Sequence, residues 1–168
     1  MNIIQTADTQ TVLNAADQYS GFSNALEKIT KEEIRFENGL SAFEDYKGFT
    51  YRKELRLKPF IYMHSSYDSN VSFVCVDPFI LDPSFKVLLN EETVKNLELE
   101  DSSDVIILCL VSVGKDMYTT TANLMSPIVI NARSMKGEQV IMEHLGPEYL
   151  RFNVWNSIGQ NNLTVSRK

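Results

Sequence analysis

Short apolar runs, separated by turn signals, are the feature of this sequence that most constrains its fold. In residues 48–57, Phe49 and Tyr51 alternate with polar neighbours, the pattern of a half-buried strand. Pairs such as Asn38-Gly39 and Lys136-Gly137 mark turns between the runs. Further strand-like runs cover 59–65, 71–77, 104–113, 127–131 and 138–143. The pattern predicts a mainly β fold, a small antiparallel β-barrel or a barrel-like sandwich.

Two stretches depart from the strand pattern. Asn90 precedes Glu91 and Glu92 in a segment typical of a capped short helix. Residues 1–33 form an N-terminal extension that we expect to be helical, because Val12, Leu13, Ala16 and Tyr19 fit helical spacing. We therefore divide the chain as follows: extension 1–33, β-barrel domain 34–146 and C-terminal tail 147–168.

Charge and composition exclude several classes of protein. With 16 Lys and Arg against 22 Asp and Glu, the chain has a net charge of -6 and no basic stripe for direct nucleic-acid binding. Its longest apolar run is too short to cross a membrane, and no secretion signal opens the sequence. Cys75 and Cys109 lie in apolar runs, as reduced core thiols do. We expect a cytoplasmic protein.

Motifs for catalysis and for cofactors are missing from the sequence. The chain has two histidines, His64 and His144, and no nucleophile motif of the GxSxG type. No His/Cys clustering supplies a set of metal ligands, and no glycine-rich loop suits a phosphate. We expect no enzyme activity, no metal and no cofactor.

The segment VCVDPFILDP, residues 74–83, carries two Asp-Pro pairs around an apolar core. Since proline favours an extended residue before it, Asp77 and Asp82 are interpreted as turn-shaping residues rather than as an acid and base pair. Phe79 and Ile80 stand where a polar loop is expected. They are either folded over the barrel end or offered to a partner.

Two further stretches are candidates for partner contact. The acidic residues Glu98, Glu100, Asp101 and Asp104 form either a solvated connection or a contact for basic groups of a partner. In the second stretch, Asn123 suits a corner before Leu124 and the strand that begins near Pro127.

At these residues the sequence resembles the family of flagellar assembly factors called FliW. Residues 34–49 resemble the family's opening motif, in which Gly-Leu is followed by Phe-Glu-Asp, although Ser41-Ala42 stands here in place of the family's usual Pro-Gly. Three more motifs follow in the same order as in the family. The first is a strand followed by Asp-Pro-Phe, in residues 71–87, and the second is a helix end followed by the central strand, in residues 97–113. The third runs from Thr-Ala-Asn-Leu to Gly-x-Gln, in residues 121–141.

The resemblance implies a non-enzymatic β-barrel protein that binds the RNA-binding translational regulator CsrA, relieves its repression of flagellin messenger RNA, and also binds flagellin. A structural assembly subunit is one alternative, and a small hydrolase using Asp77 or His64 is another. Under the first interpretation, the expected partner-binding residues are Asp77, Phe79, Ile80, Glu98, Glu100, Asp101, Asp104, Asn123 and Leu124.

Overall fold

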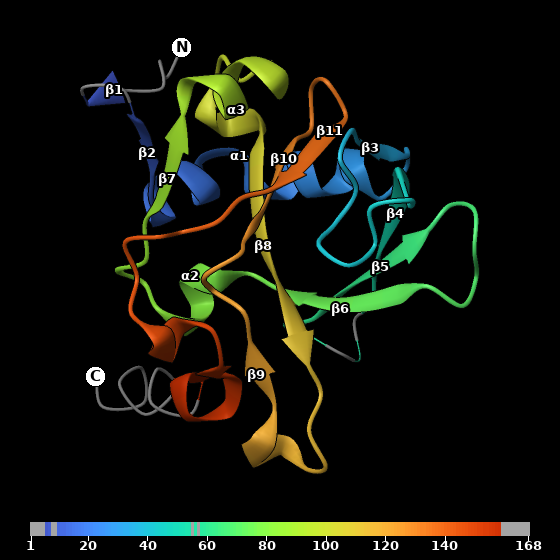
Figure 1. Ribbon diagram of the computed structural model, residues 1–168, viewed down its shortest axis with the longest axis vertical. Helices are drawn as coiled ribbons and strands as arrows, with labels where there is room; N and C mark the ends of the chain where they lie inside the picture. Colours follow the sequence, from blue (N-terminus) through green and yellow to red (C-terminus); the bar gives the residue numbers. More distant parts are fainter. Residues whose placement is uncertain (1–5, 8–9, 55, 57, 159–168) are drawn as a thin grey trace.

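A sheet that closes on itself dominates the computed structural model, which describes residues 6–7, 10–54, 56 and 58–158. The strand β8 pairs with β6 on one side and with β10 on the other, and this second pairing closes a barrel of seven strands (Figure 1). Neighbours are antiparallel except for β3 and β11, which run parallel. The barrel strands are β3 (Ile34–Phe36), β4 (Gly48–Lys53), β5 (Ile61–Ser65), β6 (Ser72–Val76), β8 (Val105–Ser112), β10 (Ile128–Asn131) and β11 (Lys136–Gln139).

The strand β8 is buried on both faces from Val105 to Cys109, which explains why this part of its sequence is apolar. Ile106 and Leu108 belong to one hydrophobic cluster, together with Phe36, Phe49 and other side chains of the barrel strands. Residues of β8 at the alternate positions, such as Ile107, belong to a second cluster with α2, β7 and the C-terminal segment. Since successive side chains of a strand point to opposite faces, one strand supports two cores.

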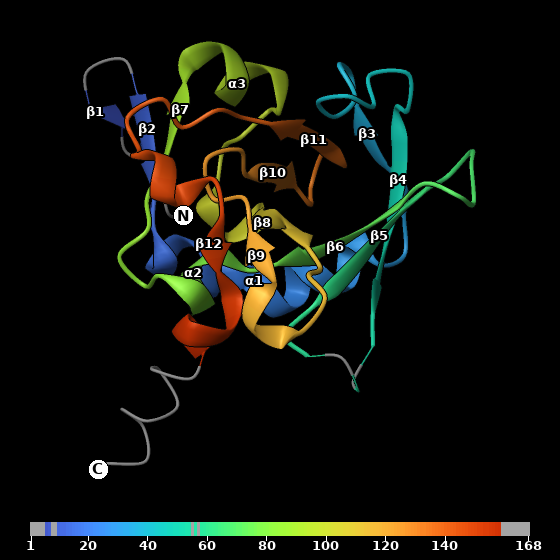
Figure 2. The same cartoon turned by 60° about the horizontal axis from the view of Figure 1, so that its bottom comes forward.

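The helix α1 (Ala15–Ile29) packs along β8 and the short helix η2 (Ser102–Asp104) (Figure 2). Its first turn is closed by a capping box between Asn14 and Asp17. A side chain at Gly21 would collide with the backbone of Ser103, so the close approach of the helix requires glycine there. The expected helical character of the N-terminal region is confirmed for these residues.

A second, three-stranded sheet was not expected from the sequence. It consists of β1 (Thr6–Ala7), β2 (Gln10–Leu13) and β7 (Val87–Asn90). The helical assignment of Val12 and Leu13 is therefore wrong, because these residues pair with Leu88 and Val87 in β7. The helix begins only after them.

Most other sequence predictions agree with the structure, with shifted bounds. Asn90 caps the helix α3 (Glu91–Asn96) as expected, and its side chain accepts a hydrogen bond of 2.8 Å from the N–H of Thr93. The strand expected over 138–143 is instead β11, which ends at Gln139. Leu55 and Leu57, assigned to the strand over 48–57, lie outside the described residues.

The C-terminal segment lies against the barrel. Its short strand β12 (Phe152–Asn153) pairs with β9 (Thr121–Ala122), and β9 pairs in turn with the end of β8. Trp155 approaches Phe60 with ring centroids 6.5 Å apart. None of the helices within the described ranges is long and apolar enough to cross a bilayer. The remaining short helices are α2 (Pro78–Leu81), η3 (Met117–Thr119) and η4 (Pro147–Tyr149).

Candidate partner-binding surfaces

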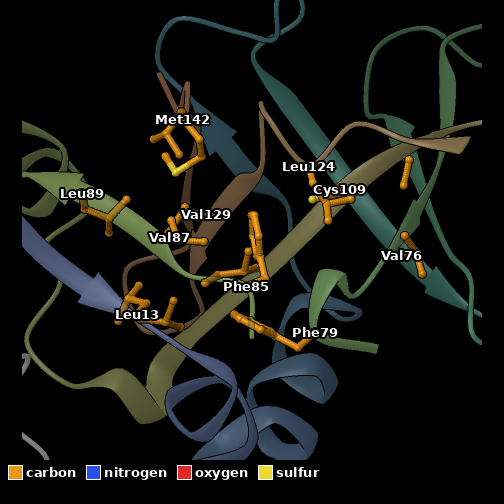
Figure 3. Packing of buried hydrophobic residues seen from close by; sticks show 14 of the residues in the cluster. Leu13, Val76, Phe79, Phe85, Val87, Leu89, Cys109, Leu124, Val129 and Met142 are labelled. Carbon is orange, nitrogen blue, oxygen red and sulfur yellow. The ribbon is translucent and has the colours of Figure 1, made fainter. Parts of the chain in front are cut away.

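Phe79 lies in the hydrophobic core, so the expectation that its side chain is offered to a partner is wrong. It is 2% exposed and belongs to the helix α2, where it packs against Phe85 with ring centroids 5.9 Å apart (Figure 3). The open alternative, in which the segment folds over the barrel, is the one that the structure shows. Ile80, on the same helix, is half-buried.

Asp77 shapes the start of this helix. Its Oδ1 accepts a 2.9 Å hydrogen bond from the N–H of Phe79, the arrangement of an N-cap. Its Oδ2 is buried and accepts no hydrogen bond from the described residues. Burial raises the pKa of Asp77 to about 6, although the bond from Phe79 opposes this shift. Partial burial, and to a smaller extent the carboxylate of Asp77, raise the pKa of Tyr19 to about 12. Asp77 therefore has a structural position and little access to a partner.

Asn123 forms the expected corner, and Leu124 is not part of the surface. The Oδ1 of Asn123 accepts hydrogen bonds from the N–H groups of Met125 and Ser126, at 3.1 and 3.2 Å. Leu124 is 0% exposed and lies next to Cys109 in the cluster that also holds Phe79 (Figure 3). The prediction of Leu124 as a contact residue therefore conflicts with its burial.

Each carboxylate of the acidic stretch has a partner within the chain. Glu98 binds Lys136 at 2.6 Å and Glu100 binds Arg133 at 3.0 Å, with side chains that are largely exposed. The carboxylate of Asp104 lies 3.6 Å from Lys28 of α1. Exposed ion pairs contribute only about 0–1 kcal/mol each, so Glu98 and Glu100 can exchange these cations for those of another protein.

Asp101 has a different role from its acidic neighbours. Its Oδ1 accepts a 2.9 Å hydrogen bond from the N–H of Ser103 and thereby caps η2. This bond lowers the pKa of Asp101. The four carboxylates lie before the first residue of β8, whereas Asn123 bonds to Leu110 near its other end. The predicted site residues thus fall into two separate regions.

The turn between β8 and β9 carries exposed apolar side chains that the sequence analysis missed. Val113 is 71% exposed, Tyr118 69% and Met117 49%. The turn is held in shape by Asp116, whose Oδ1 accepts hydrogen bonds from the N–H groups of Tyr118 and Thr119. It projects at the lower end of the molecule in Figure 1. Apolar residues on both sides of a Gly-Lys-Asp turn were the available signal.

Asn153 fixes this turn from the C-terminal segment. Its Nδ2 donates a 2.7 Å hydrogen bond to the backbone oxygen of Tyr118. An ordered loop loses little conformational entropy when it binds, and Met and Tyr are common at protein interfaces. The turn is therefore a candidate anchor for a partner protein.

His64 and Asp77, the residues of the hydrolase alternative, both occupy structural positions. His64 lies in β5, half-buried, and stacks on Tyr62 with ring centroids 6.2 Å apart. Asp77, the other residue of that hypothesis, caps α2. Within the described ranges, no three His, Cys, Asp or Glu side chains converge as a metal site would require.

Comparison with known proteins agrees with the motifs. The family model of the FliW protein matches residues 19–151. The flagellar assembly factor FliW of Caldicellulosiruptor saccharolyticus is 33% identical over 137 residues, which cover 81% of this chain and 88% of that protein. The FliW of Bacillus pumilus is 34% identical over 116 residues, covering 68% and 81%.

A solved structure extends the agreement to the fold. A crystal structure of the flagellar assembly factor FliW superposes with a TM-score of 0.64 at 33% identity, covering 69% of this chain and 81% of that one. The residues that the family model matches include most of α1 and the whole barrel. This chain belongs to the FliW family of flagellar assembly factors.

Proposed function

We propose that this protein couples flagellin synthesis to flagellar assembly by binding two protein partners in turn, the translational regulator CsrA and flagellin. The observation that carries the proposal is membership of a family whose relatives bear the name flagellar assembly factor. The protein acts by binding and not by catalysis. Its place of action is the cytoplasm, where the regulator and newly made flagellin are both found.

Partner exchange is the mechanism of the proposed coupling. Two ligands that weaken each other's binding do so reciprocally, by the same factor. When flagellin accumulates, it occupies this protein and releases the regulator, which then represses flagellin synthesis again. When flagellin is exported, the protein becomes available to bind the regulator.

The acidic surface supports the first half of this mechanism. A net charge of -6 favours encounter with a basic RNA-binding regulator and accelerates association at low salt. Glu98 and Glu100 are exposed, and within the described residues each forms an ion pair with a single cation. Their position on one side of the molecule suits a contact with basic side chains.

The turn between β8 and β9 supports an apolar contact with either partner. Val113, Met117 and Tyr118 project from a segment whose backbone is already ordered by Asp116 and Asn153. Binding energy at interfaces is concentrated in a few such aromatic and apolar anchors. Tyr118 is the residue that we expect to contribute most.

Isothermal titration calorimetry with the regulator and with flagellin from the same organism tests the proposal. Binding of both at micromolar concentration is expected, with each reducing the apparent affinity for the other. Tyr118→Ala is expected to weaken at least one interaction by about tenfold or more. Tyr67→Ala is the matched control, because Tyr67 is 73% exposed but lies on the turn between β5 and β6.

The acidic surface has its own variant. Glu100→Lys reverses an exposed charge without removing a cap, and it is expected to slow association with the regulator and to reduce the salt dependence of that rate. Absence of heat with both partners, under conditions where each partner is folded, contradicts the proposed function.

A further inference from the structure

A groove of about 530 Å³ lies beside the seam where β3 and β11 pair in parallel. Six of its lining residues carry the argument, and they are Arg35, Glu37, Asn38, Lys47, Lys136 and Gln139. None of them belongs to the turn or the acidic stretch described above. The groove borders the acidic stretch, because its Lys136 is bound by Glu98.

Two cations stand directly opposite each other across this seam. Arg35 of β3 and Lys136 of β11 are register partners, as are Phe36 and Gly137. Phe36 and Gly137 are buried, so the alternation of a strand turns Arg35 and Lys136 outward. Like charges on neighbouring strands repel each other.

The positive charge here is only partly compensated. Lys136 is bound by Glu98, but neither Arg35 nor Lys47 forms an ion pair with any residue that the structure describes. The backbone oxygen of Lys47 accepts a 2.8 Å hydrogen bond from Phe36, which places Lys47 next to the seam. Two of the three cations at this groove thus have no ion pair within the described residues of a chain whose net charge is -6.

The side chains that line the groove favour a ligand that carries a carboxylate. The guanidinium of Arg35 matches a carboxylate with two parallel hydrogen bonds, and Lys47 adds a second positive charge. The amide of Asn38 can bond to a peptide backbone, whereas that of Gln139 already bonds to Ser41 and Ser126 and holds the wall of the groove. Glu37 and Glu138 also line the groove and oppose a long polyanion such as RNA, whose binding requires an extended basic surface.

We propose that this groove binds an acidic segment of a protein partner, with one of its carboxylates held by Arg35 and Lys47. The volume of the groove lies within the range of known ligand sites. The bound carboxylate offsets the repulsion between Arg35 and Lys136. The inference does not depend on the identity of the regulator or of flagellin.

Nuclear magnetic resonance of the ¹⁵N-labelled full chain tests the site. The probe is a blocked tetraglutamate peptide, with blocked tetraglutamine, inorganic phosphate and an octauridine RNA as separate arms. Tetraglutamate is expected to shift the amide signals of residues 37–39 and 137–139 in a saturable manner. Tetraglutamine and phosphate are expected to shift them much less.

Matched variants separate a built site from general charge attraction. Arg35→Gln and Lys47→Gln are each expected to weaken tetraglutamate binding by at least about fivefold. Lys115→Gln removes one exposed positive charge from the turn between β8 and β9, and it is expected to change the affinity less than about twofold.

Three outcomes overturn the proposal. They are the absence of saturable shifts at residues 37–39 and 137–139, an equal loss of affinity in Lys115→Gln and Arg35→Gln, and tighter binding of octauridine than of tetraglutamate at the same residues. Because the test uses neither the regulator nor flagellin, its failure leaves the proposed function untouched.

Discussion

The side chain of Gln18 forms two hydrogen bonds with the backbone of Ile107, each 2.9 Å long. Its Nε2 donates to the backbone oxygen, and its Oε1 accepts from the backbone N–H. The strand β6 pairs with β8 only as far as Cys109, so this edge of β8 lacks a neighbouring strand at Ile107. A side-chain amide from α1 therefore replaces the peptide group of a missing strand.

Removing this amide is expected to destabilise the fold. Gln18→Ala leaves one buried donor and one buried acceptor at Ile107 without partners, and each costs about 1–3 kcal/mol. The free energy of unfolding, measured by denaturant titration, is expected to fall by about 2–6 kcal/mol. Asn24→Ala, at an exposed position of the same helix, is the control and should change it by less than about 1 kcal/mol. Equal stability of the two variants would contradict the role of Gln18.

Substitutions of Phe79 and Tyr118 are expected to differ in their effect on the free energy of unfolding. Phe79→Ala removes a core side chain and should lower the free energy of unfolding by about 3–5 kcal/mol. Tyr118→Ala removes an exposed ring and should change it by less than about 0.5 kcal/mol. Thermal or denaturant unfolding measures both. A stable Phe79→Ala variant would show that the ring is not part of the core in solution.

The buried carboxyl of Asp77 is expected to make stability depend on pH. Burial raises its pKa from the ordinary 3.8 to about 6 in the folded chain. A raised folded pKa contributes stability below the unfolded pKa, and this contribution is lost as the pH rises through 6. The difference in unfolding free energy between the natural chain and Asp77→Asn should therefore change by about 2–3 kcal/mol between pH 4 and pH 7.5. If the unfolding free energies of the natural chain and of Asp77→Asn depend on pH in the same way, the carboxyl of Asp77 does not carry the pH dependence.

Ala42 occupies a backbone conformation that favours glycine. The N–H of Phe43 donates to the oxygen of Leu40, and φ is 66° at Ala42, so the turn has the form of type II. Ala42→Gly is expected to raise the free energy of unfolding by about 0.5–1 kcal/mol, because a left-handed alanine costs about 1–2 kcal/mol. Ala16→Gly, in the exposed face of α1, should instead lower it by up to about 1 kcal/mol. A lower melting temperature for Ala42→Gly would contradict the turn assignment.

The sequence predicted those parts of the fold that depend on local patterns. Alternation and turn residues identified most of the strands, among them the run over 104–113 that forms β8. Asn90 was recognised as a cap because its signal lies within four residues. Family motifs within 34–141 indicated the same barrel.

Features that depend on distant segments were missed or misassigned. Val12 and Leu13 have helical spacing, but β7, about 75 residues later, offers them a strand partner. Phe79 was assigned to the surface because it stands where a polar loop is expected. Its burial depends on contacts with other segments, such as those around Phe85 and Leu124, which the local sequence does not reveal. The groove at Arg35 and Lys136 exists only because two strands about 100 residues apart meet in parallel.

The most direct test of the account measures whether this protein releases CsrA from flagellin messenger RNA and whether flagellin reverses that release. Fluorescence anisotropy of a labelled leader RNA bound to the regulator reports both steps. The account predicts that anisotropy falls when this protein is added and rises again when purified flagellin follows. An anisotropy that stays constant through both additions, with all three proteins folded, would contradict it.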